Sequence, residues 1–287
     1  MTLNSEAGLV RSKIDEFLAS DSNRLGIDDE RLWDPALVGF AAGDDPLFAE
    51  IKAAIGDFYW TPAEAFALAF PGQAFSDDEL TVVAWVLPQT QATRRDPAME
   101  AAQPSRRWSY SKKFGEDVER EFQDYMTAAL AGGGIDAAAP ERLPDWRVNP
   151  DWGFASRWSH RHAAHAAGLG TFGLCGGLIT PVGKAMRCLS LVVRAPIEPT
   201  PRPYHGLHDY CLFYARGTCG RCMERCPSGA ITPQGHDTRV CRDYLSNVTK
   251  PWVEKTFGFT GRAFDTNACG LCQTGVPCEA GIPRRLR

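Results

Sequence analysis

The sequence predicts an α/β or α+β domain followed by a smaller, cysteine-rich domain. Three observations support this prediction: 44% of the 287 residues are hydrophobic, helix and strand patterns alternate up to residue 197, and eight of the ten cysteines fall between residues 211 and 287. A chain of this length and composition can bury one large core or two modest ones. Three prolines at 199, 201 and 203 form a stiff linker, so we expect domains at 1–204 and 205–287.

The first elements follow from the spacing of apolar residues. Residues 5–20 carry Leu, Val, Ile and Phe at helical intervals, which predicts an amphipathic opening helix. Pro46 and Pro62 each suit the first turn of a further helix. Residues 81–87, with the sequence TVVAWVL, are continuously apolar and β-branched, which predicts a buried strand.

The middle of the chain continues the alternation. Residues 89–113 are polar and are expected to form a loop over a site. A helix is predicted over 115–130, where apolar residues recur before three glycines, and a second over 156–167. Residues 177–181 and 188–197 predict two strands, and the whole pattern favours a layered α/β or α+β fold.

Composition limits where the protein works. No stretch approaches the roughly 18 apolar residues that a transmembrane helix needs, so no membrane partner is expected. Residues 1–20 lack a basic segment followed by an apolar core, which predicts a cytoplasmic protein without an export signal. Stable disulfides are rare in a reducing cytoplasm, so the clustered cysteines are expected to hold a metal or to do redox chemistry.

The cysteine-rich part is also basic. Residues 211–287 hold eleven Lys and Arg against six Asp and Glu, whereas the whole chain has a net charge of −4. The excess either offsets the negative charge of thiolate-bound clusters or belongs to ordinary solvated loops. It is too small to predict a nucleic-acid partner.

The cysteine spacing carries the strongest functional signal. It runs Cys211-x7-Cys219-x2-Cys222-x3-Cys226-Pro, followed by Cys241 and then by Cys269-x2-Cys272-x5-Cys278. A [4Fe-4S] cluster takes four thiolates, and in two-cluster ferredoxins the last cysteine of such a run serves the other cluster. The spacing therefore predicts two [4Fe-4S] clusters. The expected ligands are Cys211, Cys219, Cys222 and Cys278 for the first cluster, and Cys226, Cys241, Cys269 and Cys272 for the second.

Two alternatives remain for these residues. Paired C-x2-C turns also suit a tetrahedral zinc site. In addition, a plain ferredoxin would need only the last 77 residues, so the other domain must bind a redox partner, a substrate or another cofactor, or serve only as a docking scaffold.

Two blocks of sequence resemble the epoxyqueuosine reductase family. The first is WSHRHAAHAAGLG at 158–170, followed by Phe172-Gly173, Gly177-Leu-Ile-Thr180, Arg187 and Ser190-Leu-Val-Val193. The second is GTCGRCMERCPSGAI at 217–231, with Cys241-Arg-Asp-Tyr244 and Cys269-Gly-Leu-Cys-Gln273. The resemblance extends over roughly residues 75 to 285, and reductive dehalogenases share the same plan.

The resemblance implies a cobalamin-dependent reductase. A nitroreductase-like first domain is expected to hold the cobalamin, and a two-cluster, ferredoxin-like second domain to supply electrons for a small organic substrate. The implied electron donor is a low-potential protein of the ferredoxin or flavodoxin type. Gly168, Leu169 and Gly170 either approach the flat macrocycle or simply end a helix.

The chain departs from the family in places that matter for chemistry. The stretch 154–160 lacks the two carboxylates that the family carries there, and Arg216 occupies the place of a first cluster cysteine. Another group must then deliver protons, and His160, His162 and Tyr110 are the candidates, with ordinary structural roles as the alternative. Cys175 and Cys188 are expected to be buried free thiols.

Three functions are compatible with this sequence. The first is an oxidoreductase that passes electrons through two clusters to a corrinoid and a small substrate. The second is a two-cluster electron carrier whose first domain docks a partner. The third is a protein that reduces or processes the corrinoid itself.

Overall fold

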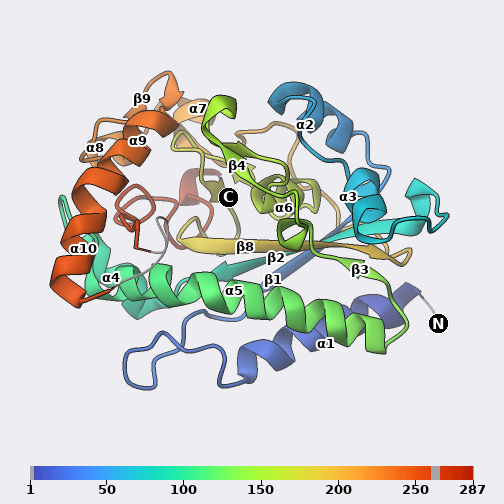
Figure 1. Cartoon of the computed structure of the whole chain (residues 1–287). Helices are drawn as coiled ribbons and strands as arrows, with labels where there is room; N and C mark the ends of the chain where they lie inside the picture. The colour runs from blue at the N-terminus through green and yellow to red at the C-terminus, as the bar shows by residue number, and fades with distance from the viewer. Residues whose placement is uncertain (1–2, 260–265, 287) are drawn as a thin grey trace.

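The computed structural model describes residues 3–259 and 266–286, and a four-stranded antiparallel sheet is its centre (Figure 1). The strand order is β1-β2-β8-β3, with β1 at Leu37–Ala42, β2 at Leu80–Pro88, β8 at Met186–Arg194 and β3 at Ala137–Ala138. β2 pairs with β8 along its full length, from Leu80 opposite Arg194 to Pro88 opposite Met186. The antiparallel pairing makes this an α+β arrangement.

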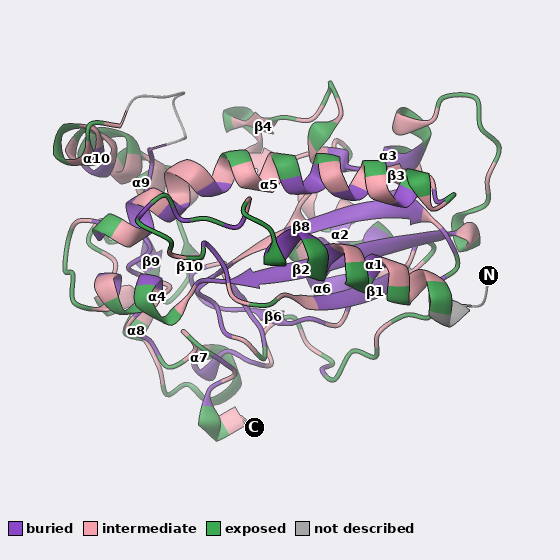
Figure 2. Ribbon diagram, turned by 90° about the horizontal axis from the view of Figure 1, so that it is seen from below, coloured by how far each residue is buried: buried purple, intermediate pink, exposed green. Residues whose placement is uncertain are grey.

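Helices cover both faces of the sheet (Figures 1 and 2). α1 (Leu3–Ala19) and α5 (Arg106–Gly132) pack on one face, where alternate residues of β2 such as Val83 and Trp85 meet them. α3 (Pro62–Ala69) and α6 (His160–Ala166) pack on the other face against Val82 and Val86, with α2 (Leu47–Ile55) beside them. Because both faces are covered, all nine residues of β2 are buried, as the apolar run predicted.

Most predicted elements of this layer are present, with two errors. Residues 89–113 were expected to be a loop, but they form α4 (Gln91–Ala98) and the first turns of α5. The side chains of Thr90 and Ser105 accept hydrogen bonds from backbone N–H groups and so begin these two helices. The analysis also missed β1, a short edge strand that contains a glycine.

Short elements connect the layer to the cysteine-rich part. Between β3 and β8 lie β4 (Val148–Asn149), β5 (Ala155–Ser156), β6 (Thr171–Phe172) and β7 (Leu178–Ile179), with 3-10 turns at Pro140–Arg142 and Pro150–Trp152. Further 3-10 turns precede β2 at Asp77–Glu79 and follow the cysteine-rich helices at Arg284–Leu286. β6 and β7 form a two-stranded hairpin. Strand β8 then returns the chain to the central sheet.

The cysteine-rich part consists of short helices around irregular loops, at one end of the sheet (Figure 1). Its elements are α7 (Leu212–Arg216), α8 (Arg221–Glu224), β9 (Ile231–Thr232), β10 (Gly235–His236), α9 (Thr238–Tyr244), a π-helical turn at Leu245–Thr249 and α10 (Lys250–Phe257).

Backbone hydrogen bonds join this part to the main layer. Lys184 N–H donates to the Cys278 carbonyl at 2.9 Å, and Ala185 N–H donates to the Glu279 carbonyl at 3.2 Å. The Arg225 guanidinium donates to the Pro97 carbonyl at 2.7 Å. The beginning of β8 therefore lies directly against the loop that carries Cys278. No helix within the described ranges is long and apolar enough to cross a membrane.

Candidate functional site

One set of four cysteines surrounds a narrow cavity, which we call the first cavity. Its walls include Cys211, Cys219, Cys222 and Cys278 together with apolar side chains and Lys184. Cys211 immediately precedes α7, and Cys222 lies in α8. Gly217 ends α7 in a left-handed conformation, with φ of 64°, which turns the chain from one cysteine toward the next. These are the four thiols that the spacing grouped together.

The other four cysteines line a second cavity of about 330 Å³. Cys226 follows α8, Cys241 lies in α9, and Cys269 and Cys272 come from the loop after residue 266. Gly270, between the last two, has φ of +75°, and an added Cβ would lie 2.1 Å from the Trp108 indole. Only glycine fits this close approach, so the loop is held against α5. Across the described residues, no three His, Cys, Asp or Glu side chains are placed to hold a single metal ion.

Cys175 and Lys184 lie between the two groups of thiols. Cys175 hydrogen-bonds with Cys222 of the first group and with Cys272 of the second. These bonds lower the pKa of Cys175, and Lys184 adds to the effect by donating to the Cys175 sulfur at 3.2 Å. Lys184 is 2% exposed; burial opposes its charge, but the surrounding thiols raise its pKa above the usual value.

Both extra cysteines are free thiols, as predicted, but their surroundings differ: Cys175 is buried and Cys188 is half-buried. Cys188 packs among apolar side chains, and burial raises its pKa to about 12. Cys175 is buried, but its sulfur is in contact with the two thiol groups rather than with a hydrocarbon core alone. Chain spacing could not predict this position, because Cys175 is 36 residues from Cys211.

A charged chamber of about 640 Å³ opens beside the second cavity. Cys241, Lys112 and Asn267 line both spaces. Helix α5 supplies one wall, because residues three or four apart along a helix share a face. That wall is made by Lys112, Glu116, Glu119, Arg120 and Gln123, and the opposite side by Glu141, Arg142, Trp146, Val148 and Leu245.

The carboxylates of the chamber differ in their pKa values. Burial raises the pKa of Glu119 to about 7, although Arg187 Nε lies 3.4 Å from its Oε1 and opposes the shift. The neighbouring carboxylates of Glu116 and Glu141 push the Glu119 pKa further up. Glu116 is also buried, but the cations of Lys112 and Arg187 outweigh burial and lower its pKa. The chamber thus holds one carboxyl that gains or loses a proton near neutral pH.

His160 is the predicted catalytic residue that lies nearest to this chamber. Its Nε2 is 2.5 Å from the Glu141 carboxylate and its Nδ1 is 2.7 Å from Ser190 Oγ. Trp158 Nε1 donates to the same Ser190 oxygen at 2.9 Å. His160 therefore orients Glu141, which lines the chamber, and acts on the chamber through that residue.

His162 and Tyr110 lie elsewhere. Burial lowers the pKa of His162 to about 3, and its ring packs 4.8 Å from Phe172, so it is a neutral core residue. Tyr110 lies in α5 rather than in a loop, and its ring packs against Phe114 and Phe259. Neither residue lines the thiol cavities or the chamber as described.

Gly168, Leu169 and Gly170 pack against the chain itself. A Cβ at Gly168 would lie 2.7 Å from the Pro201 carbonyl oxygen, and a Cβ at Gly170 would lie 2.3 Å from the Ile179 carbonyl oxygen. Leu169 is buried in the core on the α6 face of the sheet. The two glycines are therefore needed for close backbone packing after α6, and this accounts for the motif without a macrocycle.

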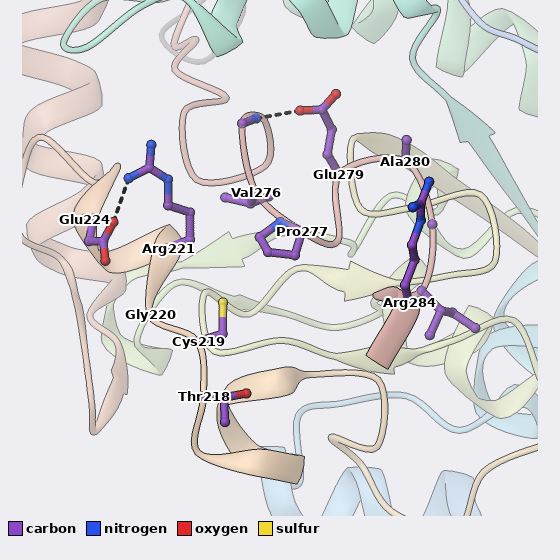
Figure 3. A pocket seen from close by; sticks show the side chains of 13 residues that line it. Thr218, Cys219, Gly220, Arg221, Glu224, Val276, Pro277, Glu279, Ala280 and Arg284 are labelled. Carbon is purple, nitrogen blue, oxygen red and sulfur yellow. Dashed lines mark hydrogen bonds and ion pairs between the residues drawn. The ribbon is translucent and has the colours of Figure 1, made fainter. Parts of the chain in front are cut away.

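An open groove of about 740 Å³ adjoins the first cavity, and Figure 3 shows the side chains that line the groove. Cys219 lines both the groove and the first cavity. Arg221 and Arg284 are exposed at the groove, and Arg221 forms an ion pair of 2.6 Å with Glu224. The four spaces thus follow one another: groove, first cavity, second cavity and chamber.

Sequence reasoning missed Glu119 and Lys184. Glu119 belongs to a series of charged residues at helical spacing, which resembles a solvated helix face. Lys184 is a single lysine in a turn between two strands, with no motif around it. Only the tertiary packing shows that Lys184 is buried and Glu119 half-buried.

Comparison with known proteins supports the resemblance seen in the sequence. No family model matches the chain. Epoxyqueuosine reductase from Listeria monocytogenes is 30% identical over 148 residues, which cover 49% of this chain and 35% of that protein. Four further curated relatives bear the same name. The chain is homologous to epoxyqueuosine reductases. The match spans about a third of the length of these curated relatives, which are oxidoreductases.

Solved structures show a related fold. A reductive dehalogenase described as B12-dependent has a TM-score of 0.51 at 15% identity, covering 96% of this chain and 37% of the other. An epoxyqueuosine reductase solved with a tRNA stem loop has a TM-score of 0.46 at 20% identity, covering 96% of this chain and 68% of that one. That protein was solved with a nucleic acid bound. At 15% identity, the likeness to the dehalogenase shows a related fold.

The donor sets of this chain fit iron–sulfur clusters. Each cavity brings together four thiols, which is the number of ligands that a [4Fe-4S] cluster takes. The second cavity, at about 330 Å³, has room for a cluster, whereas the first measures about 20 Å³, so its four thiols must move apart for a cluster to enter.

The residues around the chamber do not fit a whole cobalamin. Pockets of about 300–1,000 Å³ accommodate drug-sized ligands, and a corrin ring with its nucleotide tail is larger than a drug-sized molecule. The chamber measures about 640 Å³. The glycines that could approach a macrocycle are in contact with the chain's own backbone.

Proposed function

We propose that the chain is an iron–sulfur reductase that delivers single electrons to a small organic substrate in the charged chamber. The order of the four spaces carries this proposal. Cys219 is shared by the groove and the first cavity, and Cys241 is shared by the second cavity and the chamber. The Cys175 hydrogen bonds join the two thiol groups. Such an order suits a path for electrons from the surface to a bound molecule.

In this proposal the two groups of thiols each hold one [4Fe-4S] cluster. The first domain, at 1–204, binds the substrate, and the ferredoxin-like domain, at 205–287, conducts electrons. When bound, the clusters supply one electron at a time at low potential. The protein's own part is to fix the distance between them, to exclude water with the apolar walls of the first cavity, and to place Lys184 as a fixed positive charge between them.

The proposed electron donor is an acidic, low-potential carrier of the ferredoxin or flavodoxin type. Arg221 and Arg284 are exposed at the groove next to Cys219, and they offer positive charge to such a partner. Opposite charges on two partners speed their encounter, especially at low salt.

Glu119 is the proposed proton donor. A carboxyl with a pKa of about 7 is protonated in half of the molecules at neutral pH and can give up its proton. As the substrate accepts an electron pair, the Glu119 O–H bond breaks and the proton moves to the substrate. The resulting carboxylate lies near Arg187 and regains a proton from solvent in the open chamber.

The relationship to B12-dependent dehalogenases favours a second candidate, in which a free corrinoid is the molecule reduced. A tRNA substrate, as in the relative solved with a stem loop, has less support in this chain. The net charge of −4 and the lack of a basic stripe with aromatic residues are not typical of RNA-binding surfaces.

Anaerobic purification with analysis of iron, sulfide and cobalt tests the proposal. We expect about eight iron and eight sulfide atoms per chain and no retained cobalt. Stoichiometric, tight binding of added cobalamin, seen in its absorption spectrum, would support the corrinoid candidate instead. A colourless protein that contains zinc would overturn the cluster assignment.

A further inference from the structure

The chamber has a property that electron transfer does not explain, namely buried oxygens without hydrogen-bond partners. Among the described side chains, these include Gln123 Oε1 and Asn267 Oδ1, while Glu119 Oε1 has the ion pair with Arg187 but no hydrogen bond. All three residues line the chamber, and Gln123 and Asn267 are 1% and 9% exposed. Buried polar atoms nearly always have a partner in the protein, in ordered water or in a ligand. These oxygens are therefore acceptors that a ligand or ordered water in the chamber can pair with.

The orientation of the Gln123 amide is fixed by its neighbours. Its Nε2 donates to the Glu119 carbonyl at 3.4 Å, and the side chain also hydrogen-bonds to the Glu141 carboxylate. An ionised carboxylate only accepts hydrogen bonds, so the amide must present its NH2 group to Glu141. This leaves Gln123 Oε1 as a permanent acceptor at the chamber.

The charges of the chamber are largely paired within the protein. Lys112 pairs with Glu116, and Arg142 pairs with Asp124 at 3.0 Å. Arg120 pairs with Asp117 at 2.5 Å. A charged ligand would have to compete with these ion pairs, so the wall favours an uncharged one.

Apolar side chains complete the wall. Trp146, Val148 and Leu245 line the same chamber and offer a surface for a flat, apolar body. The apolar surface and the unpaired acceptor oxygens together fit a molecule with an apolar ring and donor groups at its edge. The volume of about 640 Å³ lies within the usual range for a small organic ligand.

We propose that the chamber binds a small, uncharged aromatic molecule that carries at least two N–H or O–H donors, and that Gln123 and Asn267 select it. Gln123 Oε1 and Asn267 Oδ1 each accept one of these donors. The inference rests on the proposed function only in taking this ligand as the molecule that is reduced. Binding itself needs no electrons.

Matched ring compounds test the selection directly. The anaerobically purified full chain is titrated with resorcinol and with 1,3-dimethoxybenzene, which has the same ring without the donors, and binding is followed by ligand-observed NMR. We expect resorcinol to bind at least tenfold more tightly. Equal affinities, or no binding of resorcinol at millimolar concentration, would overturn the inference.

Two variants locate the selection in the chamber. Gln123→Leu and Asn267→Leu are each expected to weaken resorcinol binding about tenfold, which is the effect of losing about 1.4 kcal/mol, and to leave the dimethoxy compound unchanged. Gln234→Leu, at an exposed turn, is the matched control. Two separate positions keep the test decisive if one variant folds poorly, as judged by iron content and thermal melting.

The result separates this inference from the proposed function. If the protein contains no clusters but still prefers resorcinol, the proposed reductase function is wrong and the proposed binding site is supported. If the protein holds about eight iron atoms but binds both compounds equally, the proposed binding site is wrong and the proposed electron path is supported. Unchanged resorcinol binding in both variants would also reject Gln123 and Asn267 as the selecting residues.

Discussion

The two groups of thiols contain the same number of cysteines but lie in different surroundings. The cavity of Cys211, Cys219, Cys222 and Cys278 has apolar walls and adjoins an open groove at the surface. The cavity of Cys226, Cys241, Cys269 and Cys272 adjoins the charged chamber. This difference gives the proposed path a direction, since one end can meet a protein partner and the other a small molecule.

Removal of one cysteine from each group has the largest expected effect. Cys219→Ser and Cys269→Ser should each lower the iron content from about eight to about four atoms per chain. With a small chemical reductant, the Cys219→Ser protein should still turn over substrate, because the second cluster remains beside the chamber. Cys269→Ser should not.

Iron analysis and turnover with titanium(III) citrate measure this comparison. Cys188→Ser, which changes a thiol outside both groups, is the control and should keep its full iron content. If Cys219→Ser and Cys269→Ser lose turnover to the same degree, the assigned direction of the electron path is wrong. Unchanged iron in either variant would contradict the ligand sets.

Replacement of Glu119 tests the chemistry at the chamber end. Glu119→Gln should lower the turnover number by about 10²-fold or more, since general acids contribute 10²–10⁴-fold. With a pKa of about 7, the wild-type group is protonated below pH 7 and ionised above it. The wild-type rate should therefore fall about tenfold per pH unit above pH 7, and the residual rate of the variant should not show this fall.

The pH profile of turnover separates proton delivery from a structural role. Glu121→Gln, on the exposed side of the same helix, is the matched control and should follow the wild-type profile. If Glu119→Gln keeps the wild-type dependence on pH, another group supplies the proton. His160→Asn should act more weakly, because His160 reaches the chamber through Glu141.

Substitution of Lys184 tests whether its positive charge acts on both groups of thiols. Its positive charge favours the reduced, more negative state of a nearby cluster, so Lys184→Met should lower both reduction potentials by on the order of 50–100 mV. An EPR-monitored redox titration measures the two potentials. Lys255→Met removes an exposed lysine and should shift neither. A shift confined to one cluster would show that Lys184 serves only that side.

Substitutions of the exposed arginines in the groove should have the smallest effect on activity. Arg221→Glu and Arg284→Glu are each expected to slow reduction by an acidic carrier protein several-fold at low salt, with little difference at high salt. Stopped-flow reduction at several ionic strengths measures this. Arg31→Glu changes an exposed arginine outside the groove and is the control. A salt-independent effect would point to a folding defect at the groove.

Local patterns predicted much of this molecule. The apolar run at 81–87 correctly predicted the buried strand β2, because a strand covered on both faces shows no alternation of apolar and polar residues. The cysteine spacing grouped the same thiols that the two cavities bring together. The helix from Arg106 was placed too late, because its first turns are polar and their capping by Ser105 was not recognised.

The sequence by itself predicted a layered α/β or α+β design and a division of eight cysteines into two groups, because both depend on short-range periodicity and spacing. Tertiary structure alone decided that Cys175 and Lys184 lie between those groups, and that Glu119 lies in a chamber with a raised pKa. The physical reason is that burial and electrostatic environment come from segments far apart in the chain. Residues 112–123, 141–148 and 267 make one chamber only after β8 and the cysteine-rich part have packed together.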